Sequence, residues 1–279
     1  MSLVRHTDPD AFLAAAAPTF GQNPAAASLL RSFALGVKRR PPADDERLYL
    51  ATWSSDGIHA VAVQRGEHAL FVEAADAAPA AAFADDLAAE HPSLQGVTGA
   101  LAACESFARR WRDRTARAMV LRAHLRHHLL TDVAEVPVVA GRMRMAEDAD
   151  ADWLLDASLE FVVEAGMPDT PTQVRRNVPV VLAQRRYRIW DDDGIAAFAG
   201  WSDAGDADAR IGPVYTPVAR RRRGYATALV AALAHEIKAN GGRRVFLTTD
   251  VANPTSNAIY ARIGFRPLSD FYHFDFVTA

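Results

Sequence analysis

Four consecutive arginines, Arg220–Arg223, stand directly before a glycine and an apolar run, in the segment RRRRGYATALVAAL at residues 220–233. The apolar residues recur at helical spacing: Ala226, Leu229, Val230, Leu233 and Ile237. With Gly241 as a stop signal, this pattern predicts a helix over Tyr225–Asn240. The first N–H groups of a helix lack intrahelical partners and carry partial positive charge, so they bind phosphate readily. Because Gly224 has no Cβ and the arginines add charge-assisted donors, the segment predicts a diphosphate site.

The wider sequence limits which phosphate ligand is expected. It contains neither the GxxxxGK(S/T) loop of nucleotide hydrolases nor a GxGxxG segment after a strand, so an ATPase or a dinucleotide enzyme is disfavoured. A nucleic-acid binder that uses Arg220–Arg223 is a competing hypothesis. The chain has a net charge of -3 and a pI near 6.3, and one basic turn lacks the broad basic stripe and interleaved aromatics of such proteins. We therefore expect no nucleic-acid partner.

The elements that must position this segment follow from hydrophobic periodicity and turn residues. In the N-terminal part we expect a three-stranded meander followed by helices and strands in alternation. The expected strands are 47–53, 58–64, 68–74, 94–99 and 118–130, and the expected helices are 78–92 and 100–116. Asp56-Gly57 supplies a hairpin turn between the first two strands, and Pro92 ends the first helix.

The C-terminal part begins after a connector at 131–141. The expected strands are 142–146, 187–190, 195–201, Arg210–Thr216 and 244–250, and the expected helices are 147–166, part of 167–186, Tyr225–Asn240 and a short one after Asn253. Asp191–Gly194 is a strong hairpin signal. Pro217–Arg223 is expected to be a tight loop between a strand and the phosphate-binding helix. The order of elements predicts an α/β fold with a mixed sheet.

Two segments in this part carry a resemblance. Arg221, Gly224 and Ala226 have the Arg-x-x-Gly-x-Ala spacing of the acyl-CoA loop of GCN5-related N-acetyltransferases (GNAT). The segment NPTSNAIYARIGF at 253–265 resembles the next segment of that family. The resemblance implies a complete GNAT domain at 139–279, ending in a closing hairpin with DFYHFDF as its last strand. Residues 1–138 more loosely resemble a degenerate copy of the same fold without the acyl-CoA loop, as in tandem members of the family.

The resemblance also implies the cofactor and its contacts. In that family acetyl-CoA enters between two strands that splay apart. Here Val214, Tyr215 and Thr216 would offer main-chain groups to the pantetheine arm, and Asn253 would hydrogen-bond to it. The pyrophosphate would be wrapped by the loop residues Arg221, Arg222, Arg223, Gly224, Tyr225, Ala226 and Thr227. Ser256 is expected to cap its helix, with cofactor contact as a secondary role.

Acetyl transfer also needs a proton donor and a neutral amine. Tyr260 would lie near the thioester sulfur and, as a phenol, would donate a proton to the departing thiolate. The expected strand Arg210–Thr216 contains no acid that could serve as base. Glu160 and Glu164, one helical turn apart, either bind or deprotonate the amine through water or are ordinary solvent-facing carboxylates. Asp250 is expected to cap the turn before Asn253.

The remaining histidines and the cysteine indicate no metal site. His124, His127 and His128 have no acid or cysteine at ligand spacing nearby, so we interpret them as polar-face residues of a strand. Cys104 is the only cysteine, which excludes an intramolecular disulfide, and a buried position on a helix is expected for it.

The leading hypothesis is an acetyl-CoA-dependent N-acetyltransferase acting on a primary amine of a small molecule or a protein N-terminus. A non-catalytic acyl-CoA-binding or regulatory module is the alternative, because the strand glutamate used by some relatives is missing. No apolar run reaches about 18 residues, so we expect no membrane span and a cytoplasmic protein. The acceptor amine, the acyl-chain preference and the oligomeric state, a homodimer included, stay open.

Overall fold

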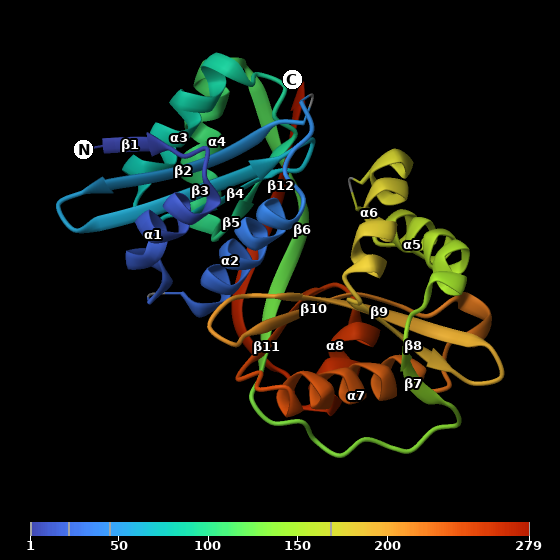
Figure 1. Cartoon of the computed structure of the whole chain (residues 1–279). Helices are drawn as coiled ribbons and strands as arrows, with labels where there is room; N and C mark the ends of the chain where they lie inside the picture. The colour runs from blue at the N-terminus through green and yellow to red at the C-terminus, as the bar shows by residue number, and fades with distance from the viewer. Residues whose placement is uncertain (1, 22, 45, 168, 279) are drawn as a thin grey trace. The chain divides into compact units, whose positions relative to one another are not determined.

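The computed structural model describes residues 2–21, 23–44, 46–167 and 169–278 (Figure 1). The chain divides into two compact units. The first unit holds the described residues up to His127, together with Asp250–Ala252 and the described residues from Ser269 onward. The second holds His128–Thr249 and Asn253–Leu268. The C-terminal segment therefore packs with the first unit rather than the second, and the expected boundary between 138 and 139 stays a prediction.

The first unit contains one sheet with two helices on each face. Its elements are β1 (Ser2–Arg5), α1 (Pro9–Phe20), α2 (Pro24–Arg39), β2 (Leu48–Ser55), β3 (Ile58–Arg65), β4 (Leu70–Glu73), α3 (Ala77–Glu90), β5 (Gly96–Gly99), α4 (Leu101–Thr115) and most of β6 (Arg117–Leu130) and β12 (Arg266–Thr278). The strand order is β1-β2-β3-β4-β5-β12-β6. Among the described pairs, β1–β2, β2–β3, β3–β4 and β5–β12 are antiparallel, and β4–β5 is parallel. The predicted meander and the helices after it are confirmed.

The sequence patterns above assigned no element to the first 46 residues, where the structure contains α1 and α2. Both helices begin with signals that are visible in the sequence. The Asp8 carboxylate accepts the backbone N–H groups of Asp10 and Ala11, and Asn23 accepts that of Ala26, in each case with proline in the first turn. Both helices are rich in alanine, and their buried faces are built largely from small residues, so no run of large apolar side chains marked them in the sequence.

The two faces of this sheet hold separate cores. On one face, α3 and α4 pack on the sheet through large side chains such as Phe83, Phe107 and Trp111. On the other, α1 and α2 bury Phe12 and Leu30. Cys104 is buried on α4 as predicted, and burial raises the pKa of its thiol to about 12. Leu101, at the first position of α4, is 40% exposed.

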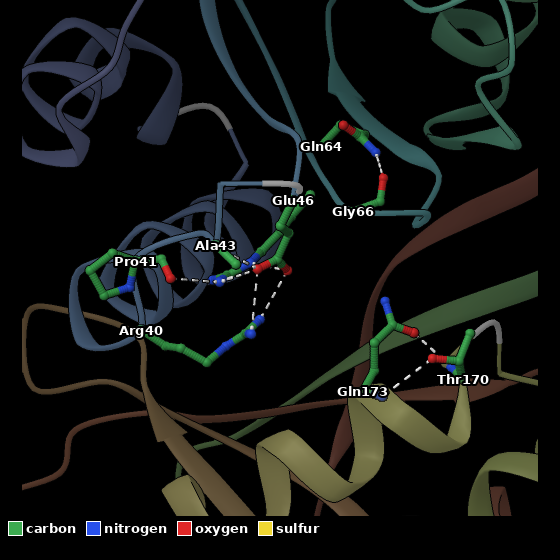
Figure 2. A network of polar contacts seen from close by, with 9 residues as sticks. Arg40, Pro41, Ala43, Glu46, Gln64, Gly66, Thr170 and Gln173 are labelled. Atoms are coloured by element: carbon green, nitrogen blue, oxygen red, sulfur yellow. Dashed lines mark hydrogen bonds and ion pairs between the residues drawn. The ribbon is translucent and has the colours of Figure 1, made fainter.

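A buried carboxylate organises the segment that leads into β2 (Figure 2). Glu46 accepts hydrogen bonds from Arg40 at 3.1 Å and from Arg65 at 2.8 and 3.0 Å, and from the backbone N–H of Ala43. Its side chain is only 8% exposed. The hydrogen bonds from Arg65 are the main cause that lowers the pKa of Glu46 from 4.5 to about 2.

Glu46→Gln is expected to destabilise the protein by about 1.5–3 kcal/mol at pH 7, because it removes the charge from hydrogen bonds between ionised partners. The folded pKa of Glu46 lies below its usual value, so its stabilisation is present above pH 4.5 and is lost as the pH falls toward 2. Urea unfolding at pH 7 and pH 3 should therefore show a smaller difference between wild type and variant at pH 3. An equal difference at both pH values would contradict this, and Glu90→Gln, at a 65% exposed side chain, is the control.

The second unit repeats the arrangement of a sheet between helix pairs. Its elements are β7 (Arg142–Met145), η1 (Asp148–Asp150), α5 (Ala151–Glu164), α6 (Pro171–Ala183), β8 (Tyr187–Asp191), β9 (Ile195–Asp203), β10 (Ala209–Tyr215), η2 (Val218–Arg220), α7 (Tyr225–Ala239), β11 (Val245–Asp250) and α8 (Pro254–Ile263). The strand order is β11-β10-β9-β8-β7, with β10 and β11 parallel and the other pairs antiparallel. Each unit thus has the predicted α/β architecture with a mixed sheet.

Figure 1 shows α5 and α6 on one face of this sheet and α7 and α8 on the other. On the α7 face, Leu229, Val230 and Leu233 are fully buried, as their spacing predicted. On the α5 face, the core includes Leu154 and Phe198. The predicted helix ends are also confirmed. Residues with positive φ follow α5, α7 and α8 at Gly166, Gly241 and Gly264. A capping box between Thr170 and Gln173 starts α6 (Figure 2).

Two expectations about the strands are wrong. The closing hairpin is absent, since Arg266–Thr278 is one continuous strand, β12, whose Tyr272–Asp275 pair with β5. His127 and His128 do not lie on a polar face, because they are 1% and 4% exposed. His128 Nε2 lies 3.0 Å from the Thr249 hydroxyl, so a polar neighbour rather than water accommodates this ring.

None of the helices in the described residues is both long and apolar enough to cross a bilayer. No three His, Cys, Asp or Glu side chains within the described ranges are arranged to hold a metal ion.

Candidate functional site

Strands β10 and β11 of the second unit pair only where they begin. Their parallel register joins Ala209 to Val245 and Arg210 to Phe246, and within the described chain no further residue of β10 is in register with β11. On its other side β10 stays paired with β9, with an irregularity between Ile211 and Val214. The β11-facing main-chain groups at the end of β10 are therefore left unpaired by the sheet. Val214–Thr216, the residues expected to offer main-chain groups to the pantetheine arm, lie at this point.

The Thr216 side chain marks the same place. Its hydroxyl oxygen is buried and has no hydrogen-bond partner among the described residues. A buried polar atom without a partner costs free energy unless water or a ligand satisfies it. The amide groups of a pantetheine arm have both donors and acceptors, so this hydroxyl fits the group that the sequence predicted here.

The corresponding strands of the first unit do not separate. There β4 and β5 are parallel and stay in register through Val72 and Gly99, the last residue of β5. A Cβ added to Gly99 would come within 2.3 Å of the Val72 carbonyl oxygen, so the glycine allows very close strand contact. The first unit therefore combines closed strands with the absence of an Arg-x-x-Gly-x-Ala loop.

The second unit places a glycine at the start of α7, as predicted. Gly224 is the residue before the helix and has φ +84°, a conformation that favours glycine. A Cβ there would lie 2.9 Å from Cγ1 of Val139 in the connector. No side chain of the described residues caps α7, so the N–H groups of its first turn are left for another partner. The helix N-terminus thus has the open donors that a diphosphate requires.

The four arginines before this helix differ in what they contact. Arg220 donates to the Asp192 carbonyl oxygen at 3.4 Å, and Arg221 donates to the Thr216 carbonyl oxygen and to Glu164. Arg222 and Arg223 are exposed and make no hydrogen bond or ion pair with any residue that the structure describes. Arg222 also has a positive φ of 63°, which is uncommon for a residue with a side chain.

The β8–β9 hairpin holds the loop in place. The Tyr225 hydroxyl, at the first position of α7, donates to a carboxylate oxygen of Asp192 in the hairpin. Tyr225 is buried, and so is Thr227 two residues later. Their side chains therefore anchor the helix start, and any cofactor contact expected of these two residues is left to their main chain. The half-buried Ala226 lies between them.

Tyr215 links the end of β10 to α5. Its hydroxyl donates to Glu160 Oε2 at 3.0 Å, and the ring packs in the core on the α5 face. Burial, and next the hydrogen bond to Glu160, raise the pKa of Tyr215 to about 12, so it is the donor at neutral pH. The sequence predicted only a main-chain role for Tyr215. It missed this side-chain contact because nothing local connects residues 55 positions apart.

Glu160 and Glu164 are both exposed on α5. Each carboxylate has a partner near the proposed phosphate site. Glu160 accepts from Tyr215, and Glu164 pairs with Arg221 at 2.5 Å. Both carboxylates are thus solvent-exposed, as one of the two expectations had it, and each also has one side-chain partner. The alternative role, as amine-binding groups or bases, stays a prediction.

At the start of α8 the cap differs from the expected one. Asn253, not Ser256, is the N-cap, and its Oδ1 accepts the backbone N–H of Ser256 at 3.0 Å. Ser256 lies in the first turn, so its expected capping role is wrong. The capping bond uses Oδ1 of Asn253 and leaves its amide N–H₂ as the group that faces other partners. Asp250 accepts from the Ala252 backbone N–H at 2.8 Å, as expected for a turn-capping residue.

Tyr260 lies on α8, half-buried against the α7-side core, with its ring edge-on to Phe265 at 5.9 Å. Burial raises the pKa of Tyr260 to about 12. The Tyr260 hydroxyl has no hydrogen-bond partner among the described residues. No hydrogen bond between described residues connects it to Glu160 or Glu164. The phenol is thus protonated at neutral pH and open to a ligand. The structure brings the two glutamates to Tyr215 and Arg221 but does not bring them to Tyr260.

Comparisons with known proteins relate the second unit to a protein family and the whole chain to solved structures. The family model described as acetyltransferase (GNAT) family matches residues 151–265. A tandem GNAT protein from the clavulanic acid biosynthesis pathway matches with a TM-score of 0.60 at 16% identity, over 99% of this chain and 98% of that one. A Drosophila protein matches with a TM-score of 0.67 at 16% identity, over 99% and 98%. A GCN5-related N-acetyltransferase from Sphaerobacter thermophilus matches with a TM-score of 0.58 at 16% identity, over 88% and 85%.

The search of curated proteins finds no match. The full-length structural matches confirm the fold of a tandem GNAT protein, which the sequence resemblance predicted. The family match covers both α7 with its glycine-led N-terminus and α8 with Tyr260. Residues 151–265 therefore match the acetyltransferase (GNAT) family, and the chain as a whole shares its fold with a tandem GNAT structure.

Proposed function

We propose that this protein is an acetyl-CoA-dependent N-acetyltransferase that passes the acetyl group directly to a primary amine of a small molecule or a protein N-terminus. The observation that carries the proposal is the divergence of β10 and β11 beside the uncapped, glycine-led start of α7. An open strand edge suits an extended pantetheine arm, and the helix start suits a diphosphate. The clavulanic acid pathway protein, whose described structure is without AcCoA, is similar over its whole length.

Each part of the cofactor has residues to hold it. Val214, Tyr215 and Thr216 would present main-chain groups to the pantetheine, and the Asn253 amide would add a donor. Main-chain N–H groups from Arg222 to Thr227 would surround the diphosphate. Bound acetyl-CoA supplies the thioester carbonyl that the amine attacks.

Acetyl transfer also needs residues of the chain that donate and accept protons. Tyr260 would hold a proton at its hydroxyl, because its pKa of about 12 keeps it protonated at neutral pH, and would deliver it to the sulfur atom as the C–S bond breaks. Glu160, whose second carboxylate oxygen has no hydrogen bond within the described chain, would bind the incoming amine and accept its proton through water.

The alternative is an acyl-CoA-binding module without turnover. It is favoured by one observation, the absence of any acid on β10, which leaves no carboxylate on the strand beside the proposed thioester. The two functions predict the same cofactor binding and differ only in product formation.

Isothermal titration with acetyl-CoA at two salt concentrations tests the shared part of the proposal. We expect saturable binding that weakens at higher salt, because the diphosphate is held partly by charge. Detection of free CoA thiol in a screen of small amines and short peptides then separates enzyme from binding module. Absence of acetyl-CoA binding would contradict both functions.

A further inference from the structure

Arg221 opens the Arg-x-x-Gly-x-Ala loop, yet its guanidinium group is occupied on the α5 side. Its Nε donates to the Thr216 carbonyl oxygen at 2.9 Å, and its Nη2 pairs with Glu164 Oε2 at 2.5 Å. The guanidinium carbon also lies 5.6 Å from the centre of the Tyr215 ring. Three contacts thus hold one side chain between the end of β10 and the last turn of α5.

The charge of this arginine is already balanced. Arg221 and Glu164 form an ion pair, in which the two opposite charges cancel. A diphosphate near this pair would meet repulsion from Glu164 as well as attraction to Arg221, so the pair adds little net attraction. Arg222 and Arg223 have no carboxylate partner in the described chain, and their positive charge is not cancelled in this way.

We propose that Arg221 is a positioning residue, which fastens the phosphate-binding loop to α5 through Glu164 and Thr216, and that Arg222 and Arg223 supply the side-chain charge for the diphosphate. This inference rests on the proposed function, since it assigns roles within the same cofactor site. The contact between Arg221 and Glu164 also lies close to Glu160, the residue proposed to bind the amine. Glu160, one turn from Glu164 on α5, is held by Tyr215, so the loop, the end of β10 and α5 are joined at two successive turns of the helix.

The test measures the Kd for CoA in wild type, Arg221→Gln, Glu164→Gln and the double variant. If Arg221 acts through its tie to α5, each single change should weaken CoA binding by about threefold, the range of an exposed ion pair. The double variant should be no weaker than either single one, because both changes break the same contact. The dependence of Kd on salt should stay as in wild type, whereas Arg222→Gln and Arg223→Gln should reduce it.

A direct phosphate contact would give the opposite sign for Glu164→Gln. Removing the competing carboxylate would then free Arg221 and tighten CoA binding, while Arg221→Gln would weaken it and reduce the salt dependence. That result, or an unchanged Kd for Glu164→Gln, overturns the inference while leaving the proposed function standing. If wild type does not bind CoA, the proposed function fails, and the inference fails with it.

Two matched controls keep these outcomes distinct. Asp156→Asn removes a carboxylate from the exposed face of α5 two turns before Glu164, and Arg175→Gln removes an exposed arginine from α6. Among the described residues, neither side chain has a hydrogen bond or ion pair with the loop, so both variants should bind CoA as wild type does. If Asp156→Asn shifts Kd as much as Glu164→Gln does, the effect is one of general charge and the tie is overturned. Circular dichroism and thermal unfolding of every variant show that each is folded.

Discussion

Gly224→Glu is expected to abolish measurable CoA binding, with a Kd at least 100-fold above that of wild type. The glycine has φ +84°, and any Cβ there would come within 2.9 Å of Val139 Cγ1, so the loop would have to shift. The new carboxylate would also lie beside the N–H groups of α7 that are meant to bind the diphosphate. Strain and charge act in the same direction. Isothermal titration with CoA measures the loss.

Gly224→Ala is the matched control, because it adds the Cβ without the charge. The Kd of Gly224→Ala for CoA should lie between that of wild type and that of Gly224→Glu. Thermal unfolding should show that both variants still fold, since Gly224 is exposed and lies outside the helix. Wild-type affinity in Gly224→Glu would show that the start of α7 does not bind the cofactor. The strand divergence would then be the only remaining feature of the site.

Tyr260→Phe is expected to lower kcat by about 100-fold, the lower end of the range for loss of a general acid, with the Kd for CoA within twofold of wild type. The substitution removes one oxygen atom that has no hydrogen-bond partner in the described chain, so packing against Phe265 should persist. Release of CoA thiol with an amine found in the screen measures kcat, and titration measures Kd. Turnover at the wild-type rate would rule out the proton-donor role.

The pH profile adds a second check on Tyr260. Burial raises the pKa of this phenol to about 12, so it stays protonated throughout the range from pH 6 to 10. The wild-type kcat should therefore show no fall caused by Tyr260 below pH 10. A basic limb in that range that is present in wild type and absent in Tyr260→Phe would contradict the assigned proton donor.

Local sequence patterns were enough to predict the elements of the phosphate-binding segment. The recurrence of Leu229, Val230 and Leu233 identified α7, and Gly224 identified its start, because helical period and glycine conformation are properties of neighbouring residues. The hairpin signal at Asp191–Gly194 and the helix stop at Gly241 were predicted on the same ground. These signals act over a few residues, so they can be read without knowing the fold.

Other features depend on contacts between residues that lie far apart in the sequence. The spacing around Arg221 predicted a phosphate ligand, but the folded chain brings Glu164, 57 residues away, to its guanidinium group. His127 and His128 read as polar-face residues, yet neighbouring elements bury them. The strand β12 reads as part of a hairpin, but its pairing with β5 keeps it extended. In each case a partner distant in sequence competes for the side chain or the backbone, and no local pattern shows where that partner will lie.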